Sequence, residues 1–388
     1  MRLKSLKPNL HLIKGQLVFL RLDLNLPQEK GKIKEDFKIQ QSLATINLLL
    51  QNDNRLIIAS HLGQPKNGFD SKYSLRPVIN HLAKNLNQKI FFFDYQNYSK
   101  WTDVRRILKS EKDVKIFALD NLRFYPGEER DCRRLAKSFA SLAPIYVNEA
   151  FAVSHRANSS ISAILDTDVK AYAGLLLEAE INNLNKILSP KKPLVVVMGG
   201  AKISTKLAII KKLLKIADYV LIGGALANNF FQAQGFETGK SLVDDFNQVE
   251  LLKLLKTKKI ILPSDVVVKS NGSKVMNKRL EQITEYDNIL DLGPQTLKLF
   301  SEYIKSAQTI VWNGPLGYFE KEEFRSGTLN LAKAIAKRSK AGAFSLVGGG
   351  ETVAAVNLAQ VKKDFDWVST GGGAMLSYLS GQKMPGIN

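Results

Sequence analysis

Short apolar runs that end in polar or glycine residues recur along the whole chain, with segments of helical periodicity between them. The runs predicted as strands include LVFLRLDLNLP (17–27), RLIIASHLGQP (55–65), VKIFALDNLRF (114–124), IYVNEAF (145–151), PLVVVMGGAK (193–202) and KIILPSDVVV (259–268). One helical segment has apolar residues at spacings of three and four, which line one helical face: Ile39, Leu43, Ile46 and Leu50. Because strands alternate with helices, the pattern predicts parallel βαβ units and an α/β fold class.

The ends of the predicted strands change in character midway along the chain. Before residue 160 they carry His, Arg, Asn and Asp, and after residue 190 they carry glycine pairs and triplets. Between these parts, residues 172–193 are predicted as a helix that stops at Ser189-Pro190. Its apolar positions recur all round, as expected of a helix between domains. We therefore expect two α/β domains, the first facing an anion and the second rich in glycine.

The composition favours anionic partners without identifying one. The chain has 388 residues and 56 Lys and Arg against 36 Asp and Glu, a net charge of +20. The lysines are dispersed, which is also typical of solvated faces, and no basic tail marks a nucleic-acid module, so nucleic acid is an unlikely partner. A single cysteine, Cys132, excludes a disulfide framework, and no run predicts a signal peptide or a membrane span. We expect a cytoplasmic protein.

The segment GGAKISTKLAII (199–210) predicts a polyphosphate site. We expect a helix after Gly199 and Gly200, with Lys202 and Lys206 on one face of its first turn. Cations there oppose the helix dipole by roughly 0.3–1 kcal/mol each unless an anion is bound. Free N–H groups together with two lysines would hold phosphates. The alternative is a plain strand–helix turn with surface lysines, since the segment matches neither a Walker A loop nor a G-x-G-x-x-G fingerprint.

Three further glycine-rich strand ends repeat this theme: GGALA (223–227), GGGET (348–352) and TGGGA (370–374). Glu351 in the second of them could hold Mg²⁺ on a nucleotide, or could simply satisfy the helix dipole. In VWNGPLGYFE (311–320), Asn313 could hydrogen-bond a phosphate and Glu320 a ribose hydroxyl, although a tight turn explains the Asn-Gly-Pro sequence equally well.

The strand ends of the first half gather charged and polar residues. Asp23 and Asn25 follow Arg21, and further strand ends supply His61, Arg123, His155 and Arg156. Each residue alone could form a structural salt bridge. Because they lie at the ends of four predicted strands, they together indicate a basic pocket for a small phosphorylated acid.

These motifs, in this order, resemble those of the phosphoglycerate kinase family over essentially the whole chain: RLDLNLP, SHLGQP, DNLRFYPGEE, YVNEAFAVSHRA, GGAKISTK, LIGGALA, DLGPQT, VWNGPLGYFE, GGGET and STGGGA. The resemblance implies two Rossmann-like, doubly wound parallel-sheet domains joined by a helix, with a cleft between them. It implies a triose-phosphate-binding domain over 1–171, a linking helix over 172–190 and a nucleotide-binding domain over 191–370, with 371–388 returning to the first domain.

The implied reaction is reversible, Mg²⁺-dependent phosphoryl transfer between ATP and 3-phosphoglycerate in glycolysis, with ADP as the other nucleotide. By motif, the substrate-binding residues are Asp23, Asn25, His61, Gln64, Arg123 and Arg156. The nucleotide-binding residues are Gly199, Gly200, Lys202, Lys206, Gly223, Gly224, Asn313, Glu320 and Thr352, with Glu351 facing the metal. The residues implied to act on the transferring group are Lys38, Lys202 and Gly372.

Six positions depart from the family pattern. Arginine is replaced by Lys38 and Gln64, aspartate by Glu149, Thr205 and Glu351, and glycine by Ala225. Losing one preorganised donor can cost roughly 2.7–4 kcal/mol of transition-state stabilisation. Two hypotheses therefore stay open: a working phosphoglycerate kinase with reduced activity, and a catalytically weakened relative that serves as a structural or moonlighting subunit of a larger assembly, docked on an acidic protein partner.

Overall fold

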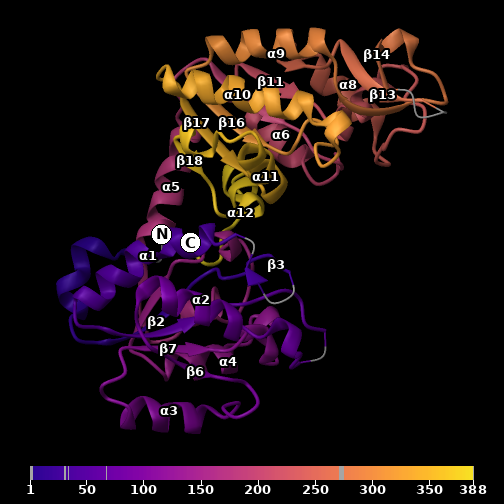
Figure 1. Ribbon diagram of the computed structural model, residues 1–388. Helices are drawn as coiled ribbons and strands as arrows, with labels where there is room; N and C mark the ends of the chain where they lie inside the picture. The colour runs from indigo at the N-terminus through magenta and orange to yellow at the C-terminus, as the bar shows by residue number, and fades with distance from the viewer. Residues whose placement is uncertain (1–2, 30–31, 34, 67, 271–274, 388) are drawn as a thin grey trace. The chain divides into compact units, whose positions relative to one another are not determined.

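The computed structural model describes residues 3–29, 32–33, 35–66, 68–270 and 275–387 (Figure 1). The chain divides into two compact units. Unit 1 comprises Met1–Ile181 and Lys383–Asn388, and unit 2 comprises Asn182–Gln382. Both units contain parallel sheets covered by helices, so the predicted α/β fold class is confirmed.

Unit 1 is built on a seven-stranded sheet in the order β1-β9-β8-β2-β5-β7-β6, and each pairing in it is parallel. Its strands are β1 (Lys4–Ser5), β2 (Leu17–Arg21), β5 (Arg55–Ala59), β6 (Ile90–Phe93), β7 (Ile116–Leu119), β8 (Ile145–Asn148) and β9 (Lys170–Ala173). A short hairpin, β3 (Gln28–Glu29) and β4 (Lys32–Ile33), lies outside this sheet. The runs predicted as strands near 17–27, 55–65, 114–124 and 145–151 therefore form four neighbouring strands, β8, β2, β5 and β7.

Helices cover both faces of this sheet: α1 (Phe37–Gln51), α2 (Arg76–Leu86), α3 (Trp101–Ser110) and α4 (Arg133–Ala140). On one face, buried Ile46 of α1 and Val78 of α2 belong to the same apolar core as Val18 of β2. On the other face, the Phe19 ring packs 5.5 Å from the ring of Phe139 in α4. The apolar residues that recur every three and four positions in α1 thus face the sheet, as the sequence predicts.

Unit 2 is built on a six-stranded parallel sheet in the order β12-β11-β10-β16-β17-β18. Its strands are β10 (Leu194–Met198), β11 (Tyr219–Ile222), β12 (Ile260–Ile261), β16 (Thr309–Asn313), β17 (Phe344–Gly348) and β18 (Trp367–Val368). The helices of this unit are α6 (Leu207–Leu214), α7 (Ala225–Ala233), α8 (Gln248–Leu255), α9 (Pro294–Ser306), α10 (Ser326–Lys340), α11 (Gly350–Leu358) and α12 (Gly372–Leu379). Helices α9 and α10 run side by side (Figure 1) and share one buried core with the sheet around Trp312.

A small antiparallel sheet in unit 2 departs from the prediction. The sequence predicts one strand over 259–268, but the structure splits it into β12 and β13 (Asp265–Lys269). β13 pairs with β14 (Val275–Arg279) and β15 (Asn288–Leu292) in a separate sheet with the order β14-β13-β15. Pro263 lies at the break, where its missing N–H cannot continue a ladder.

The linking helix and the C-terminal return also differ in extent from the implied ranges. Helix α5 (Leu175–Leu188) begins later than residue 172, because 170–173 form β9, and the division between the units falls inside it, after Ile181. Of residues 371–388, those from Lys383 onward belong to unit 1. The part before Lys383 contains α12, which packs against α6 of unit 2.

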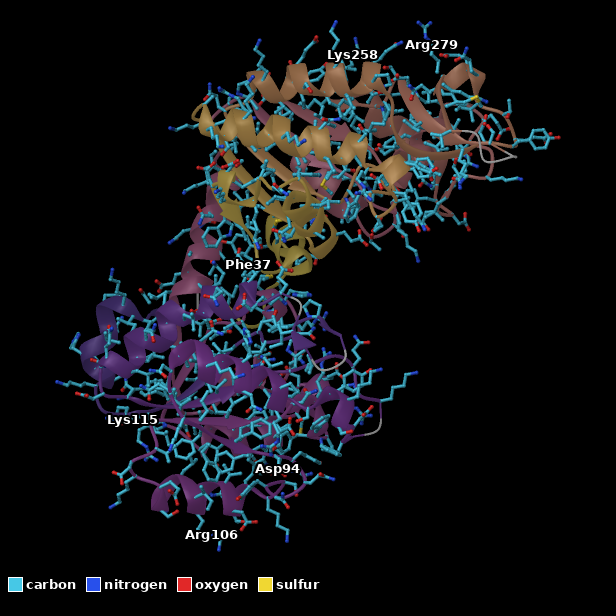
Figure 2. The ribbon with its side chains drawn as sticks, in the orientation of Figure 1. Phe37, Asp94, Arg106, Lys115, Lys258 and Arg279 are labelled. Atoms are coloured by element: carbon cyan, nitrogen blue, oxygen red, sulfur yellow. The ribbon has the colours of Figure 1, made fainter. Side chains whose placement is uncertain are left out.

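Many charged side chains project from the surfaces of the units, as the dispersed lysines predict. Figure 2 shows Arg106 and Lys115 on unit 1 and Lys258 and Arg279 on unit 2, and each of these side chains is exposed. Over the described residues, the structure contains no helix with the length and apolar character needed to cross a membrane.

Candidate active site

Four neighbouring strands of unit 1 end at the same edge of the sheet, and their carboxyl ends carry the residues predicted to bind an acid. Asp23 follows β2, His61 follows β5 and Arg123 follows β7. The strand-end loops are joined directly, because Asn25 Oδ1 accepts a hydrogen bond from Gly63 N at 3.0 Å and Arg123 Nη1 donates to the Gly63 carbonyl. Parallel pairing puts these side chains at the ligand-binding edge of an open sheet.

Lys38, near the start of α1, reaches into this edge and pairs with a buried carboxylate. Its Nζ lies 2.6 Å from Asp23 Oδ2 and also donates to the Asn25 carbonyl at 3.3 Å. Burial alone would raise the pKa of Asp23, but the charge of Lys38 and its hydrogen bond to the carboxylate lower it below its usual value. Asp23 therefore carries a negative charge that holds the lysine in place. We call Asp23, Lys38, His61 and Arg123 the strand-end cluster.

His61 is a neutral hydrogen-bond donor within this cluster. Burial, together with the nearby positive charges of Arg21, Arg123 and Lys38, lowers the pKa of His61 well below its usual value, and Asp23 opposes this only in part. Its Nδ1 lies 3.4 Å from Arg21 Nη2. Since a guanidinium can only donate, Nδ1 accepts and the proton resides on Nε2. A neutral imidazole with its proton on Nε2 can donate from that atom to an anion.

Arg123 is held by its own surroundings. Asn121 fixes the backbone, since its Oδ1 accepts from Leu62 N at 3.2 Å and from Arg123 N at 3.0 Å. Arg123 Nε lies 3.0 Å from Glu129 Oε1, although the two atoms do not have hydrogen-bond geometry. The guanidinium is thus buried and oriented, with part of its donor capacity still available.

Three residues carried over by motif lie at the periphery. Asn25 and Arg156 have exposed side chains. The positive charge of Arg156 is close enough to Arg123 to lower the pKa of that residue, after the larger effect of burial. Gln64 is also exposed and lines an open polar cavity with Lys66 and Tyr73, separate from the four residues of the strand-end cluster.

A buried polar network supports the cluster from beneath, and the sequence analysis did not identify it. Arg21 Nε donates to Ser160 Oγ at 2.8 Å, and that hydroxyl donates to Glu128 Oε1 at 2.5 Å. Tyr146 Oη donates to the Ser160 carbonyl at 2.8 Å. Burial raises the pKa of Glu128 above its usual value, and the charge of Arg21 and the hydrogen bonds from Ser160 oppose this rise only in part. The DNLRFYPGEE motif contains Glu128, but its partners lie elsewhere in the sequence.

The glycine-rich strand ends of unit 2 meet through their backbones. Gly200 N donates to the Pro315 carbonyl at 2.9 Å. A Cβ at Gly199 would clash with this carbonyl, and one at Gly224, whose φ is 65°, would lie 2.8 Å from it. Glycine is required because the ends of β10, β11 and β16 approach too closely for any side chain. Gly223 follows β11 directly, and a Cβ at this position would lie 2.8 Å from Cδ2 of the Leu316 side chain.

The lysines of GGAKISTK do not share the first turn of a helix, which corrects the prediction. Helix α6 begins only at Leu207, so Lys202 lies in the preceding loop, exposed, and Lys206 directly precedes the helix. Lys206 Nζ donates to the Gly199 carbonyl and lies 3.4 Å from the Asn313 carbonyl. Burial lowers the pKa of Lys206 to about 8, opposed by the carboxylate of Glu351. Lys206 is thus an ammonium group held against the glycine loop.

Asn313 and Thr352 brace this loop. Asn313 Nδ2 donates to the Gly348 carbonyl at 2.7 Å, and Thr352 Oγ1 accepts from Gly314 N at 2.7 Å. Both side chains are buried. One of the two N–H donors of the Asn313 amide, which was expected to meet a phosphate, is therefore already bonded to backbone. Gly372, at the start of α12, packs on Gly349 so closely that a Cβ would clash with Gly349 Cα.

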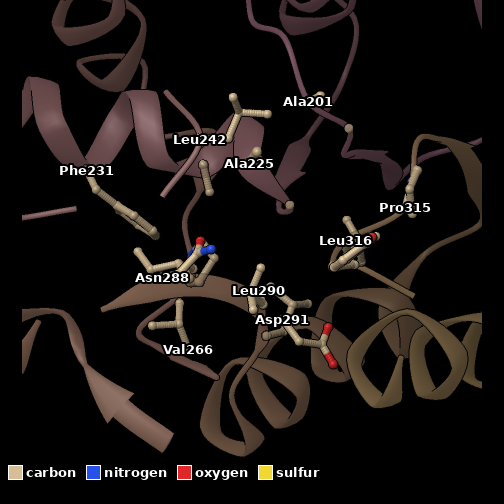
Figure 3. Close-up of a pocket in the computed structure, with 18 of the residues that line it drawn as sticks. Ala201, Ala225, Phe231, Leu242, Val266, Asn288, Leu290, Asp291, Pro315 and Leu316 are labelled. Atoms are coloured by element: carbon tan, nitrogen blue, oxygen red, sulfur yellow. The ribbon is translucent and has the colours of Figure 1, made fainter. Parts of the chain in front are cut away.

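A cavity of about 420 Å³ opens beside these glycines in unit 2 (Figure 3). Gly200, Gly224, Glu320 and Glu351 line it, as do several apolar residues that the sequence analysis did not identify: Phe231, Leu242, Val266, Leu290 and Leu316. Phe231 belongs to α7, Val266 and Leu290 belong to the antiparallel sheet, and Leu242 and Leu316 lie in loops. Because they are far apart in the chain, no single sequence motif predicts that they form one cavity wall. We call this space the glycine cavity.

The comparisons with known proteins agree with this geometry. The sequence profile of phosphoglycerate kinase matches residues 9–382. The phosphoglycerate kinase of Legionella pneumophila (strain Paris) is 40% identical over 97% of this chain and 94% of its own length, and that of Wolbachia pipientis wMel is 41% identical over 96% and 95%. The chain belongs to the phosphoglycerate kinase family. It is accordingly a phosphotransferase that uses ATP or ADP as a substrate.

Solved structures of the phosphoglycerate kinase family share the fold. The structure from Coxiella burnetii matches with a TM-score of 0.83 and 37% identity, over 97% of this chain and 96% of that one. The structure from Pyrococcus horikoshii OT3 matches with a TM-score of 0.81 and 30% identity, over 99% and 98%. The fold and the family implied by the motifs are therefore confirmed.

The positions where this chain departs from the phosphoglycerate kinase motifs can now be placed. Lys38 belongs to the strand-end cluster, and Glu351 lines the glycine cavity. Thr205 is exposed, and its hydroxyl donates to the Lys202 carbonyl at 3.0 Å. Among the described residues, no group of three or more His, Cys, Asp or Glu side chains could hold a metal ion.

Proposed function

We propose that this chain catalyses reversible, Mg²⁺-dependent transfer of the γ-phosphoryl group of ATP to the carboxylate of 3-phosphoglycerate. The observation that carries the proposal is the presence, in one chain of the phosphoglycerate kinase family, of an oriented basic cluster at a sheet edge in unit 1 and a glycine-bounded cavity in unit 2. The first suits a small phosphorylated acid, and the second suits a nucleotide with its phosphates at the glycine end.

In unit 1, the acid is bound by donors that are already oriented. Arg123, Arg156 and His61 Nε2–H meet its anionic oxygens, and Asp23, Asn25 and Gln64 complete the substrate site. An ammonium group has three N–H donors, of which Lys38 gives one to Asp23 and one to the Asn25 carbonyl. The third is free to meet an oxygen of the transferring phosphoryl group. Lys38 is thereby the residue of this chain that replaces the arginine of the family motif.

In unit 2, the phosphates lie near Gly199, Gly200, Gly223 and Gly224, and Glu320 meets the ribose. Lys206 leaves its two carbonyl partners to neutralise phosphate charge, and Lys202 approaches from the exposed loop. Asn313 and Thr352 keep the loop in shape, and Gly372 leaves room beside the transferring group. Glu351, exposed at the cavity wall, would hold the Mg²⁺ bound to the nucleotide, since carboxylates are ligands that this ion favours. The ion would neutralise phosphate charge.

The chemistry itself requires positioning and charge neutralisation. A carboxylate oxygen of 3-phosphoglycerate attacks the γ-phosphorus, the bond from that phosphorus to the bridging oxygen of ADP breaks, and an acyl phosphate forms with no net change in protons. Such transfers pass through a transition state with negative charge spread over the equatorial oxygens. Lys38, Lys202 and Lys206 are the residues of this chain that stabilise that charge.

A coupled assay tests the proposal. Purified protein with 3-phosphoglycerate and Mg-ATP is expected to turn over ATP only when both substrates are present. Replacing the partly buried Lys206 by Met is expected to lower turnover strongly, and the same change at the exposed Lys298 of α9 is expected to leave turnover intact. Absence of turnover, together with no heat of binding for 3-phosphoglycerate in titration calorimetry, would overturn the proposal.

A cytoplasmic location follows from this proposal, because both substrates are metabolites of glycolysis. No observation on the described residues favours the alternative of a structural subunit bound to an acidic protein or a larger assembly.

A further inference from the structure

The glycine cavity has two ends of different character. Figure 3 shows Ala201 and Pro315 on one side, and Phe231, Asn288 and Val266 on the other. The first side adjoins the glycines and Lys206, and the second is walled by apolar side chains. If a nucleotide occupies the cavity, as proposed above, its phosphates lie on the first side and its base on the second. The inference below rests on that proposed function.

Asn288 is placed at the base side with an unused amide. It begins β15, opposite Lys269 of β13, and is partly buried. Its side chain makes no hydrogen bond to any residue that the structure describes, and it is the one primary amide among the described residues lining the cavity. Figure 3 shows the amide directed from β15 into the space below Ala225 and Leu242.

We propose that Asn288 reads the base of the nucleotide, through hydrogen bonds from its side-chain amide to the edge of a purine. An amide offers one acceptor and two donors. Toward adenine, Oδ1 accepts from the exocyclic amino group while Nδ2 donates to the neighbouring ring nitrogen, which is the pairing that asparagine makes with adenine in other recognition sites. Apolar walls at this end exclude water and so make an unmatched amide costly.

The other polar side chains of the cavity are poorly suited to this role. Asp291 lines the same wall, but its carboxylate accepts from Gly327 N at 2.7 Å, and Figure 3 shows it turned away from the centre of the cavity. Lys240 can only donate and has an interaction of its own. The carboxylates of Glu320 and Glu351 only accept, and the hydroxyl of Tyr318 is a single group. Asn288 is therefore the lining side chain whose amide sets a donor atom and an acceptor atom side by side, as the edge of a base requires.

The decisive experiment compares Mg-ADP and Mg-GDP binding to the full chain by titration calorimetry. Asn288→Asp replaces the amide by a carboxylate, which accepts from both N–H groups on the guanine edge but repels the ring nitrogen of adenine. We expect the ratio of GDP affinity to ADP affinity to rise about tenfold, a size typical of one well-formed base contact. Asn330→Asp, an exposed residue of α10, is the matched control and should leave the ratio unchanged.

A second variant keeps the test decisive if the added charge disturbs folding. Asn288→Leu is expected to weaken ADP and GDP binding by a few-fold each, while pyrophosphate, which lacks a base, binds as before. If wild-type protein binds ADP and neither variant changes the ADP-to-GDP ratio or the ADP affinity, the role of Asn288 is overturned and the proposed function stands. If wild-type protein binds neither nucleotide, the nucleotide site itself is overturned.

Discussion

The ammonium of Lys38 is shared between Asp23 and the Asn25 carbonyl, which fixes a charge where the transferring phosphoryl group is proposed to lie. We predict that Lys38→Met lowers kcat on the order of 10²–10³, the size of losing one preorganised donor. Steady-state kinetics with 3-phosphoglycerate and Mg-ATP measure this. Lys109→Met, on the exposed side of α3, is the control. An unchanged kcat in Lys38→Met would remove Lys38 from the catalytic site.

His61 gives the folded chain a defined sensitivity to acid. Burial and the charges of Arg21, Arg123 and Lys38 lower its folded pKa, and Asp23 opposes them. The unfolded chain therefore binds more protons at this residue than the folded chain below about pH 6.5, and stability falls as the pH falls through that region. We predict that urea unfolding midpoints decrease less between pH 7.5 and 5.5 in His61→Gln than in wild type. His11→Gln, at an exposed residue, should behave as wild type does.

Lys206 makes the binding of phosphates depend on pH in the opposite direction. Its pKa is about 8, because burial disfavours the charged form, and a bound polyphosphate favours that form. Affinity for ADP should therefore fall as the pH rises above 8, by up to about tenfold per pH unit for one linked proton. Titration calorimetry between pH 7 and 9.5 measures this. In Lys206→Met we expect weak binding without that slope, and retention of the slope would assign it to another group.

At the scale of elements, the start of α5 depends on a buried carboxylate. Glu149, which follows β8, accepts from Leu176 N at 3.1 Å and Leu177 N at 3.3 Å, and Thr45 of α1 donates to it as well. A Cβ at Gly174 would clash with this carboxylate, so the turn before α5 is shaped around it. Glu149 thus joins α1, β8 and the helix that passes from unit 1 to unit 2.

Glu149, which caps the start of α5, makes the free energy of unfolding depend on pH. Burial raises the pKa of Glu149 to about 7, although Thr45 and the two backbone N–H groups oppose it. The folded chain then holds a proton that the unfolded chain has released, so this residue makes the protein less stable as the pH rises from about 4.5 to 7. We predict that Glu149→Gln gains stability relative to wild type from pH 5 to pH 8, by at most about 3 kcal/mol. Thermal unfolding at both pH values measures the difference, and a constant difference would contradict it.

Elements with continuous apolar runs could be predicted from the sequence, and those without them could not. β2, β5, β8 and β10 are buried on both faces, which produces the runs that located them. β14 alternates between exposed and partly buried positions and has no apolar run, so its antiparallel sheet, and with it Asn288, was not anticipated. The start of α6 was placed too early because Lys202 and Lys206 have helical spacing, whereas the loop folds Lys206 back onto Gly199.

For the candidate site, the sequence located the strand-end residues but not their partners. The positions of His61 and Arg123 followed from strand ends in a parallel sheet. The pairing of Lys38 with Asp23, and the support of Arg21 by Glu128 and Ser160, join residues far apart in the chain. Such contacts depend on the three-dimensional register of helices on the sheet, which spacing along one segment does not encode.

At the scale of the whole molecule, each unit has its own apolar core, and the segment from Lys383 completes the first. Gly386 N donates to the Ser154 carbonyl at 3.0 Å, and its carbonyl accepts from Asn148 Nδ2 at 3.0 Å. Met384 and Ile387 are buried. We predict that deleting residues 383–388 destabilises unit 1 by several kcal/mol, since burying each such side chain contributes about 1.5–3 kcal/mol, and leaves ADP affinity unchanged.

The three tryptophans allow this prediction to be measured for each unit. Trp101 belongs to unit 1, where it stacks 4.6 Å from Tyr125, and Trp312 and Trp367 belong to unit 2. In a background carrying Trp312→Phe and Trp367→Phe, Trp101 fluorescence should report an earlier urea midpoint for the truncated chain. A midpoint equal to that of the full chain would show that the segment contributes little.

The discontinuity of unit 1 has a consequence during synthesis on the ribosome. Domains generally fold in the order in which they emerge. Here residues 182–382 form a continuous stretch that emerges entire before residues 383–388 are available to the first unit. The earlier-made part must therefore wait, with the Asn148 amide lacking its bond to the Gly386 carbonyl, until translation has passed the whole of unit 2. Unit 2, which is translated later, is thus the first unit that can be finished.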